Sequence, residues 1–329
     1  MANNRKLLAA QNRLMTRPNP CKGLAFGLIY HYLTLKISAH FTLKRQRVMT
    51  YRQFFGILSL VILSLFLKPT PTLAQNLSHL KAELLCEQTS IQPGGSVTVG
   101  FHFRMQKGWH VYWQNPGDSG QAPSITWTLP EGFTAGDIQW PVPQRLVAST
   151  LADYGYTNDV ILLVPLQAPA NLKPGHIVRL SALLHWLVCQ EICIPGSAKM
   201  NLRLPVRKKA SPYNSRYASL FKGARRSLPL PLPEDWKAEV SPGAKEFHLS
   251  FDTGAPVSKT TTALFFPLHP SQIENGPKQT TTLSGNSINL SVKKSDQLSG
   301  DVKTLEGLLV VEQKGSGKKG YLVSIPLTN

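Results

Sequence analysis

Acidic residues are scarce in this sequence, and their distribution decides what the charge means. The 329 residues include 36 Lys and Arg but only 18 Asp and Glu, a net charge of +18. Residues 1–74 contain eleven basic residues and no acidic one, so residues 75–329 carry a net charge of only +7. The basic residues of this longer part form no stripe interleaved with aromatic residues, which argues against nucleic-acid binding.

Long hydrophobic runs are also missing beyond the amino-terminal region. The apolar run of residues 54–67 follows four basic residues between positions 44 and 52 and precedes Thr72-Leu73-Ala74. This order is typical of a secretory signal that is cleaved before Gln75, and the run is short for a membrane span, although an uncleaved anchor is the alternative. We therefore interpret residues 1–74 as a leader, and we expect membrane contact only through this leader if it stays uncleaved.

Met49 begins a signal of ordinary length, so we interpret residues 1–48 as a mis-assigned start. A secretory signal predicts a periplasmic location for the rest of the chain, and that compartment is oxidising enough to permit disulfides.

Helical periodicity is almost absent, whereas alternation with a period of two recurs. Apolar residues occupy every second position of residues 97–105, as a half-buried strand requires. Further strands are predicted over residues 160–167, 176–188 and 200–206. No alternation of strands with helices links them, so the pattern favours an antiparallel β-sandwich over an α/β fold.

Residues 207–235 interrupt this pattern. The segment begins with Arg207-Lys208-Lys209, which we interpret as a solvated face. Its pattern then predicts one short amphipathic helix over residues 213–228, and the segment ends in a proline-rich stretch. Strand patterns resume after Trp236. We therefore predict a β domain over residues 75–206, a connector over 207–235 and a second, smaller β-sandwich over 236–329, which contains no cysteine and is expected to be a spacer or docking module.

Cysteine is rare, yet two of the four cysteines lie at positions 189 and 193. In an extended chain their α-carbons would be about 13 Å apart, well beyond the ~7 Å that a disulfide spans, so pairing requires a turn. Closing so small a loop contributes on the order of 2 kcal/mol, against nearly ~5 kcal/mol for a hundred-residue loop, so stability alone is a poor reason for the pair. Two adjacent thiols suit exchange, because the second can resolve a mixed disulfide formed at the first.

Two other interpretations of the pair stay open from the residues alone. One is a permanent bridge in a non-catalytic immunoglobulin-like binding or assembly module, and the other is a metal carrier. The spacing is wider than the C-x-x-C typical of zinc sites, although His110, His176 and His185 would complete a site if folding gathered them. We expect no metal and no organic cofactor, and we expect Cys86, which lies in a predicted strand, to be buried and inert.

Six short motifs occur in an order that points to a known family. They are Gly108-Trp109-His110, Tyr112-Trp113, Asn115 to Gly120, Trp140-Pro141-Val142-Pro143, Tyr154-Gly155-Tyr156 and Cys189 to Pro195. Over residues 80–206 the chain resembles the amino-terminal periplasmic domain of the DsbD/ScsB family of thiol:disulfide interchange proteins, and the rest resembles the longer ScsB-type extension. The resemblance implies an immunoglobulin-like fold, so we predict an all-β protein with two immunoglobulin-like antiparallel β-sandwich domains after the leader.

The resemblance also implies a function. In that family a cysteine pair takes electrons from a DsbD/ScsB-type membrane protein and passes them to periplasmic thioredoxin-like or other disulfide-containing proteins, as in cytochrome c biogenesis. Cys189 and Cys193 match this pair, and we expect Cys193 to attack first. The chain is therefore predicted to be a component of a protein-disulfide reductase.

Site residues follow from the same resemblance. Asp153-Tyr154-Gly155 resembles the cap loop, in which an acid and an aromatic ring shield the cysteines until a partner displaces them. Without the resemblance, Tyr154 and Tyr156 would be core aromatics at a strand end, and Asp153 would be either a proton acceptor or a turn cap. Tyr112 and Trp113 are expected to pack in the core. The residues expected to line the site are Trp109, Asn115, Glu191 and Pro195.

Two departures limit the resemblance. DsbD proper has a wider cysteine spacing, so we expect this chain to be closer to the ScsB branch, and its substrates need not be those of DsbD. The sequence also reaches Asn329 without the transmembrane or thioredoxin domain of that family. We therefore expect the electron source to be a separate protein, or the sequence to be part of a longer reading frame.

Overall fold

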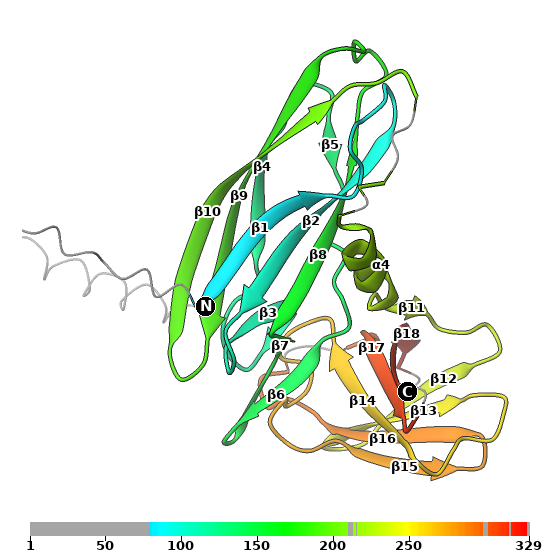
Figure 1. Cartoon of the computed structure of the whole chain (residues 1–329). Helices are drawn as coiled ribbons and strands as arrows, with labels where there is room; N and C mark the ends of the chain where they lie inside the picture. The colour runs from blue at the N-terminus through cyan, green and yellow to red at the C-terminus, as the bar shows by residue number, and fades with distance from the viewer. Residues whose placement is uncertain (1–78, 210–212, 215, 299–301, 316, 328–329) are drawn as a thin grey trace, which may run out of the picture. The chain divides into compact units, whose positions relative to one another are not determined.

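The computed structural model describes residues 79–327 apart from 210–212, 215, 299–301 and 316. The predicted leader over residues 1–74 lies outside the described residues. Within them the chain is nearly all β, with a single short helix (Figure 1), which confirms the predicted fold class. No helix of this described part is both long enough and apolar enough to cross a membrane.

The first ten strands form two antiparallel sheets, which we call the first sandwich. One sheet has the order β1-β2-β8-β5, and the other has the order β10-β9-β3-β7-β6, with β4 paired to β9. The strands are β1 (Leu80–Cys86), β2 (Ser96–Met105), β3 (His110–Gly117), β4 (Ser124–Thr128), β5 (Thr134–Ala135), β6 (Gln144–Ala148), β7 (Leu151–Thr157), β8 (Asp159–Gln167), β9 (Ile177–Cys189) and β10 (Cys193–Pro205).

The alternation over residues 97–105 is confirmed by the core of this sandwich. Val99, Phe101 and Phe103 of β2 are fully buried, because every second side chain of a strand points to the same face of its sheet. They share one apolar cluster with Trp113 and Leu184 of the other sheet. Burying aliphatic and aromatic side chains stabilises the fold by roughly 1.5–3 kcal/mol each, so this cluster holds the two sheets together.

The remaining strands form two further sheets, which we call the second sandwich. Their orders are β11-β18-β17-β14 and β12-β13-β16-β15. A separate apolar cluster that includes Phe247, Phe265 and Leu290 fills the space between them. The strands are β11 (Leu230–Pro231), β12 (Lys237–Pro242), β13 (Glu246–Asp252), β14 (Thr261–Pro267), β15 (Thr280–Ser284), β16 (Ser287–Lys293), β17 (Thr304–Gln313) and β18 (Gly317–Pro326).

The helix predicted over residues 213–228 is present but shorter. It is α4 (Ala218–Arg226), and it buries Phe221 and Ala224 in an apolar cluster with Leu163 of β8. Arg225 in its last turn also forms an ion pair with Glu87, the residue that follows β1. The segment between the sandwiches is therefore packed on the first sandwich through this helix.

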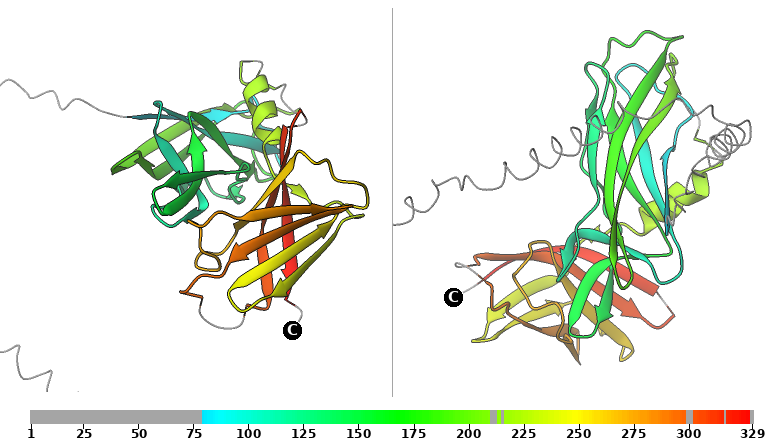
Figure 2. Two further views of the ribbon diagram at one scale, coloured as in Figure 1. Left: turned by 90° about the horizontal axis from the view of Figure 1, so that it is seen from below. Right: turned by 90° about the vertical axis from the view of Figure 1, so that its left-hand side faces the viewer.

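The strand predicted over residues 200–206 is about half of the strand that forms. β10 begins at Cys193 and pairs with β9 along its whole length, from Cys193 opposite Cys189 to Pro205 opposite Ile177. The first half of β10 contains glycine, serine and proline, which are poor strand formers, so its sequence does not predict a strand. The strand forms there because this half pairs with β9. Figures 1 and 2 show the long green strands of this hairpin.

Candidate redox site

The tip of the β9–β10 hairpin brings the two candidate cysteines together. Residues 190–192 form the turn, where the Gln190 amide donates to the Ile192 carbonyl at 3.2 Å. Cys189 and Cys193 face each other across the ladder with α-carbons 4.2 Å apart, and their sulfur atoms form a disulfide. The turn that pairing requires is therefore confirmed.

The two cysteines of this disulfide differ in exposure. Cys189 ends β9 and is only 2% exposed, whereas Cys193 begins β10 and is exposed. Exchange requires the attacking thiolate to reach one sulfur atom in line with the bond that breaks, so access decides which sulfur reacts. A protein partner can therefore reach Cys193 while Cys189 stays covered.

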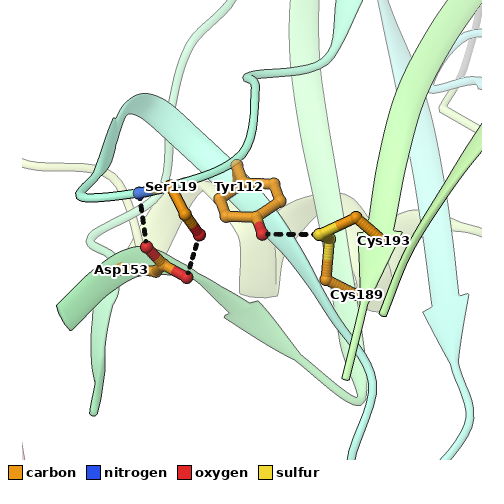
Figure 3. Close-up of a disulfide and its surroundings, with 5 residues drawn as sticks. All are labelled: Tyr112, Ser119, Asp153, Cys189 and Cys193. Carbon is orange, nitrogen blue, oxygen red and sulfur yellow. Dashed lines mark hydrogen bonds between the residues drawn. A yellow bond between two sulfur atoms is a disulfide. The ribbon is translucent and has the colours of Figure 1, made fainter. Parts of the chain in front are cut away.

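The side chain of Tyr112, in β3, lies against the disulfide. Its hydroxyl lies 3.4 Å from the Cys193 sulfur (Figure 3), and the hydroxyl must donate because a disulfide sulfur has no hydrogen. The side chain is fully buried, and this burial raises the pKa of the Tyr112 phenol. The hydroxyl is therefore protonated at neutral pH and able to donate to sulfur.

A loop of four residues, Gly117 to Gly120, lies on the other side of the Tyr112 ring, and we call it the covering loop. Gly120 has a φ of +77°, which L-residues rarely adopt. A Cβ atom at Gly120 would lie 2.0 Å from Cζ of Tyr112, closer than any real contact. Glycine is needed here because the backbone itself rests against the ring.

Asp153 of β7 fixes the covering loop. Its Oδ1 accepts a hydrogen bond from the Ser119 amide at 2.9 Å, and its Oδ2 accepts one from the Ser119 hydroxyl at 2.8 Å (Figure 3). The predicted acid therefore lies near the cysteines, but its contact with them runs through the loop and the Tyr112 ring.

The structure places Tyr154 and Tyr156 in the core and not over the cysteines. Tyr112 pairs with Gly155 across the β3–β7 ladder, so Asp153 and Gly155 share its face while Tyr154 and Tyr156 point to the other face. The Tyr156 hydroxyl donates to the Pro141 carbonyl at 2.8 Å. Burial raises the pKa of both tyrosines, Tyr154 and Tyr156, far above the usual phenol value.

His110 is a cross-strand neighbour of the buried Cys189, and the sequence did not single it out as a redox residue. It pairs with Cys189 across the β3–β9 ladder, and its ring lies edge-on to the Tyr112 ring with centroids 5.2 Å apart. Its Nε2 atom is buried without a hydrogen-bond partner among the described residues. Burial lowers the pKa of His110, against a smaller opposing effect of the Asp153 charge, so the ring is neutral at neutral pH.

The four expected lining residues lie in different places. Glu191 and Pro195 are exposed on the hairpin beside the disulfide. Trp109 is buried and stacks on the His79 ring at a centroid distance of 3.8 Å. Asn115 is buried and donates to the Pro267 carbonyl of β14 at 2.8 Å, so its side chain contacts the second sandwich. No group of three His, Cys, Asp or Glu side chains suited to a metal ion occurs among the residues described.

Comparison with known proteins identifies the part of the chain that holds the disulfide. Residues 81–205 match the family model "Thiol:disulfide interchange protein DsbD, N-terminal". This part is a DsbD/ScsB-type N-terminal domain. The matched residues of the DsbD/ScsB-type domain include both cysteines, Tyr112, Asp153 and the covering loop.

One solved structure has a similar fold over more of the chain than residues 81–205. The N-terminal periplasmic domain of ScsB from Proteus mirabilis is 19% identical with a TM-score of 0.58, and the match covers 78% of this chain and 97% of that one. The major pilin subunit of Bacillus cereus is 10% identical, with coverage of 76% and 67%, but its TM-score of 0.24 does not establish a shared fold. No curated protein matches the chain.

Two residues of the DsbD/ScsB-type domain that contact or neighbour the disulfide site were not predicted as site residues. They are His110 and Tyr112. His110 and Tyr112 are two positions apart on one strand, and this spacing places them on one face. That signal is visible in the sequence, but it does not say which face the cysteines occupy.

Proposed function

We propose that the protein carries out thiol:disulfide interchange through Cys189 and Cys193. Electrons pass from a DsbD/ScsB-type membrane protein to this pair, and from the pair to extracytoplasmic proteins that contain disulfides, such as thioredoxin-like proteins. The observation that carries the proposal is a disulfide between one exposed and one buried cysteine at a hairpin tip. The match of residues 81–205 to a thiol:disulfide interchange family supports the same chemistry.

Reduction of the pair begins at the exposed cysteine, Cys193. A thiolate of the electron donor attacks the sulfur of Cys193, the disulfide breaks, and its electron pair goes to the Cys189 sulfur, which takes up a proton. A second thiolate of the donor then attacks the donor's own sulfur in the mixed disulfide. The donor leaves oxidised, and Cys193 leaves the reaction as a thiolate, so two electrons have moved to the pair.

Transfer to a substrate reverses these roles. The Cys193 thiolate attacks the substrate disulfide and releases one substrate thiolate, and Cys189 then attacks Cys193 and releases the other. Cys189 must lose its proton before it attacks. We assign His110 as the acceptor, because it is the cross-strand neighbour of Cys189 and has a neutral ring with a buried, unpartnered Nε2.

A periplasmic location fits this chemistry. Residues 44–74 have the order of a secretory signal, and the similar domain of ScsB from Proteus mirabilis is described as periplasmic. An exchanging disulfide requires a compartment in which it can be reoxidised by substrates, and the periplasm provides one.

A mixed-disulfide trap tests the proposal. In the full chain, Cys189→Ala leaves the exposed thiol without its resolving partner, so we expect covalent complexes between Cys193 and periplasmic proteins on non-reducing gels. The matched variant Cys193→Ala leaves only the buried thiol of the pair and is expected to trap little. Equal absence of complexes in both variants would contradict the exchange reaction and favour a structural bridge.

The thiol state in cells tests the direction of electron flow. Acid quenching, alkylation and mass spectrometry of Cys189 and Cys193 are expected to show partial reduction, which is lost when a DsbD-type membrane protein is deleted. A pair that stays fully oxidised with or without that protein would mean that the disulfide belongs to a non-catalytic binding module.

A further inference from the structure

The second sandwich contacts the covering loop through one buried side chain. Asn275 lies between β14 and β15 and is 7% exposed. Its Oδ1 accepts the Tyr154 hydroxyl at 2.7 Å, and its Nδ2 donates to Oδ1 of Asp118, in the covering loop, at 2.8 Å. To bond both partners, one side chain must accept a hydrogen bond from the Tyr154 hydroxyl and donate one to the Asp118 carboxylate. An amide side chain does both, through its oxygen and its nitrogen.

Asp118 connects Asn275 to the rest of the covering loop and to β7. Its Oδ2 accepts the Ala152 amide at 2.7 Å, and its own amide donates to the Ala152 carbonyl at 3.2 Å. The next residue, Ser119, is held by Asp153, and Gly120 rests on the Tyr112 ring. A continuous series of contacts therefore leads from the second sandwich to the hydroxyl that touches the Cys193 sulfur.

The same loop of the second sandwich is also anchored to the β6–β7 hairpin. The Arg145 guanidinium donates from Nη2 to the carbonyl oxygens of Asn275 and Gly276, at 2.6 Å each. A Cβ atom at Gly276 would lie 1.9 Å from the Thr150 carbonyl oxygen, so the two backbones are in direct contact there. These contacts leave Asn275 little freedom to move away from Asp118.

Apolar packing surrounds the polar contacts. Phe266 of β14 is fully buried and lies edge-on to Tyr154 and Trp113, with centroid distances of 4.9 and 6.3 Å. Phe266, Leu308 and Val310 belong to the apolar cluster of the first sandwich although they come from the second. Aromatic pairs of this kind add roughly 0.5–1.5 kcal/mol beyond their buried area, so the contact has the character of a core.

We propose that the second sandwich is a working part of the redox site, and that Asn275 is the positioning residue that holds the covering loop against Tyr112. The inference rests on the proposed function, because it assigns the second sandwich control over how readily a thiol reaches Cys193. It replaces the expectation of a spacer or docking module with a defined role in the site.

Two tyrosine variants of the full chain test this role with matched chemistry. Tyr154→Phe removes the hydroxyl bonded to Asn275, and Tyr156→Phe removes an equally buried hydroxyl bonded within the first sandwich. We expect Tyr154→Phe to raise the rate at which glutathione reduces the disulfide by about threefold, and Asn275→Ala by about fivefold or more, since a lost hydrogen bond loosens the loop. Tyr156→Phe is expected to stay within 1.5-fold of the original protein.

Hydrogen exchange of the Ser119 amide gives a second readout that requires no redox reaction. The amide donates to Asp153, so loosening the loop in Tyr154→Phe or Asn275→Ala should speed its exchange, with no change in Tyr156→Phe. Equal behaviour of the two tyrosine variants in both measurements would overturn the role of Asn275. A disulfide that glutathione cannot reduce in the original protein, with faster Ser119 exchange in the variants, would instead contradict the proposed function alone.

Discussion

Gly120→Ala is the change that most directly tests how the covering loop protects the disulfide. The substitution has two costs. A positive φ costs an L-residue roughly 1–2 kcal/mol, and a methyl group 2.0 Å from the Tyr112 ring must push the ring or the loop aside. Overpacking of this kind costs about 1–3 kcal/mol more. We therefore expect a total loss of stability of about 2–5 kcal/mol.

Gly175→Ala is the matched control, because it separates the two costs. Gly175 also has a positive φ, of +92°, but a Cβ atom there would meet nothing within 4 Å. Gly175→Ala should therefore lose only the roughly 1–2 kcal/mol of the backbone cost. The assay is urea unfolding of both full-length variants, combined with the rate of disulfide reduction by glutathione, which should rise only in Gly120→Ala. Equal losses of stability and equal reduction rates would refute the contact between the loop and the ring.

Three further predictions concern groups near the site or beneath the helix. Arg225→Met should lower the free energy of unfolding, measured in urea, by about 2 kcal/mol, because it leaves the buried Glu87 carboxylate without its ion pair. A loss of stability below ~0.5 kcal/mol would contradict this prediction. Burial lowers the pKa of His110, so below the ordinary histidine pKa the unfolded state binds more protons than the folded state, and the free energy of unfolding falls as the pH drops from 7 to 5. His110→Gln should make this fall smaller. An unchanged dependence of stability on pH in His110→Gln would contradict the burial of the ring. Burial raises the pKa of Cys86 to about 11, so iodoacetamide at pH 8 should label it only after denaturation, and rapid labelling of the native protein would disprove its burial.

Strand periodicity and chain geometry were readable without a structure. The alternation over residues 97–105 predicted β2, and the strand predicted over residues 160–167 is β8, because a period of two is a property of the strand itself. The turn between Cys189 and Cys193 followed from the reach of an extended chain. Each of these predictions depends on residues that are neighbours in the sequence.

The ring that covers the cysteines was not readable in this way. Tyr112 and Tyr154 both lie in strands next to a turn-rich segment, and only the β3–β7 register decides that Tyr112 shares a face with Asp153 while Tyr154 faces the core. A shift of one residue would exchange the two faces, so the sequence without its strand partners could not separate them.

The sequence by itself therefore determined the all-β class, the position of several strands and the need for a turn if Cys189 and Cys193 pair, since these depend on local pattern and spacing. Only the tertiary structure decided which cysteine is exposed, which tyrosine touches it and how the second sandwich reaches the site. Asn275 lies 121 residues from Tyr154 and 157 residues from Asp118 along the chain. Contacts across such separations follow from the packing of sheets, and no local pattern in the sequence encodes them.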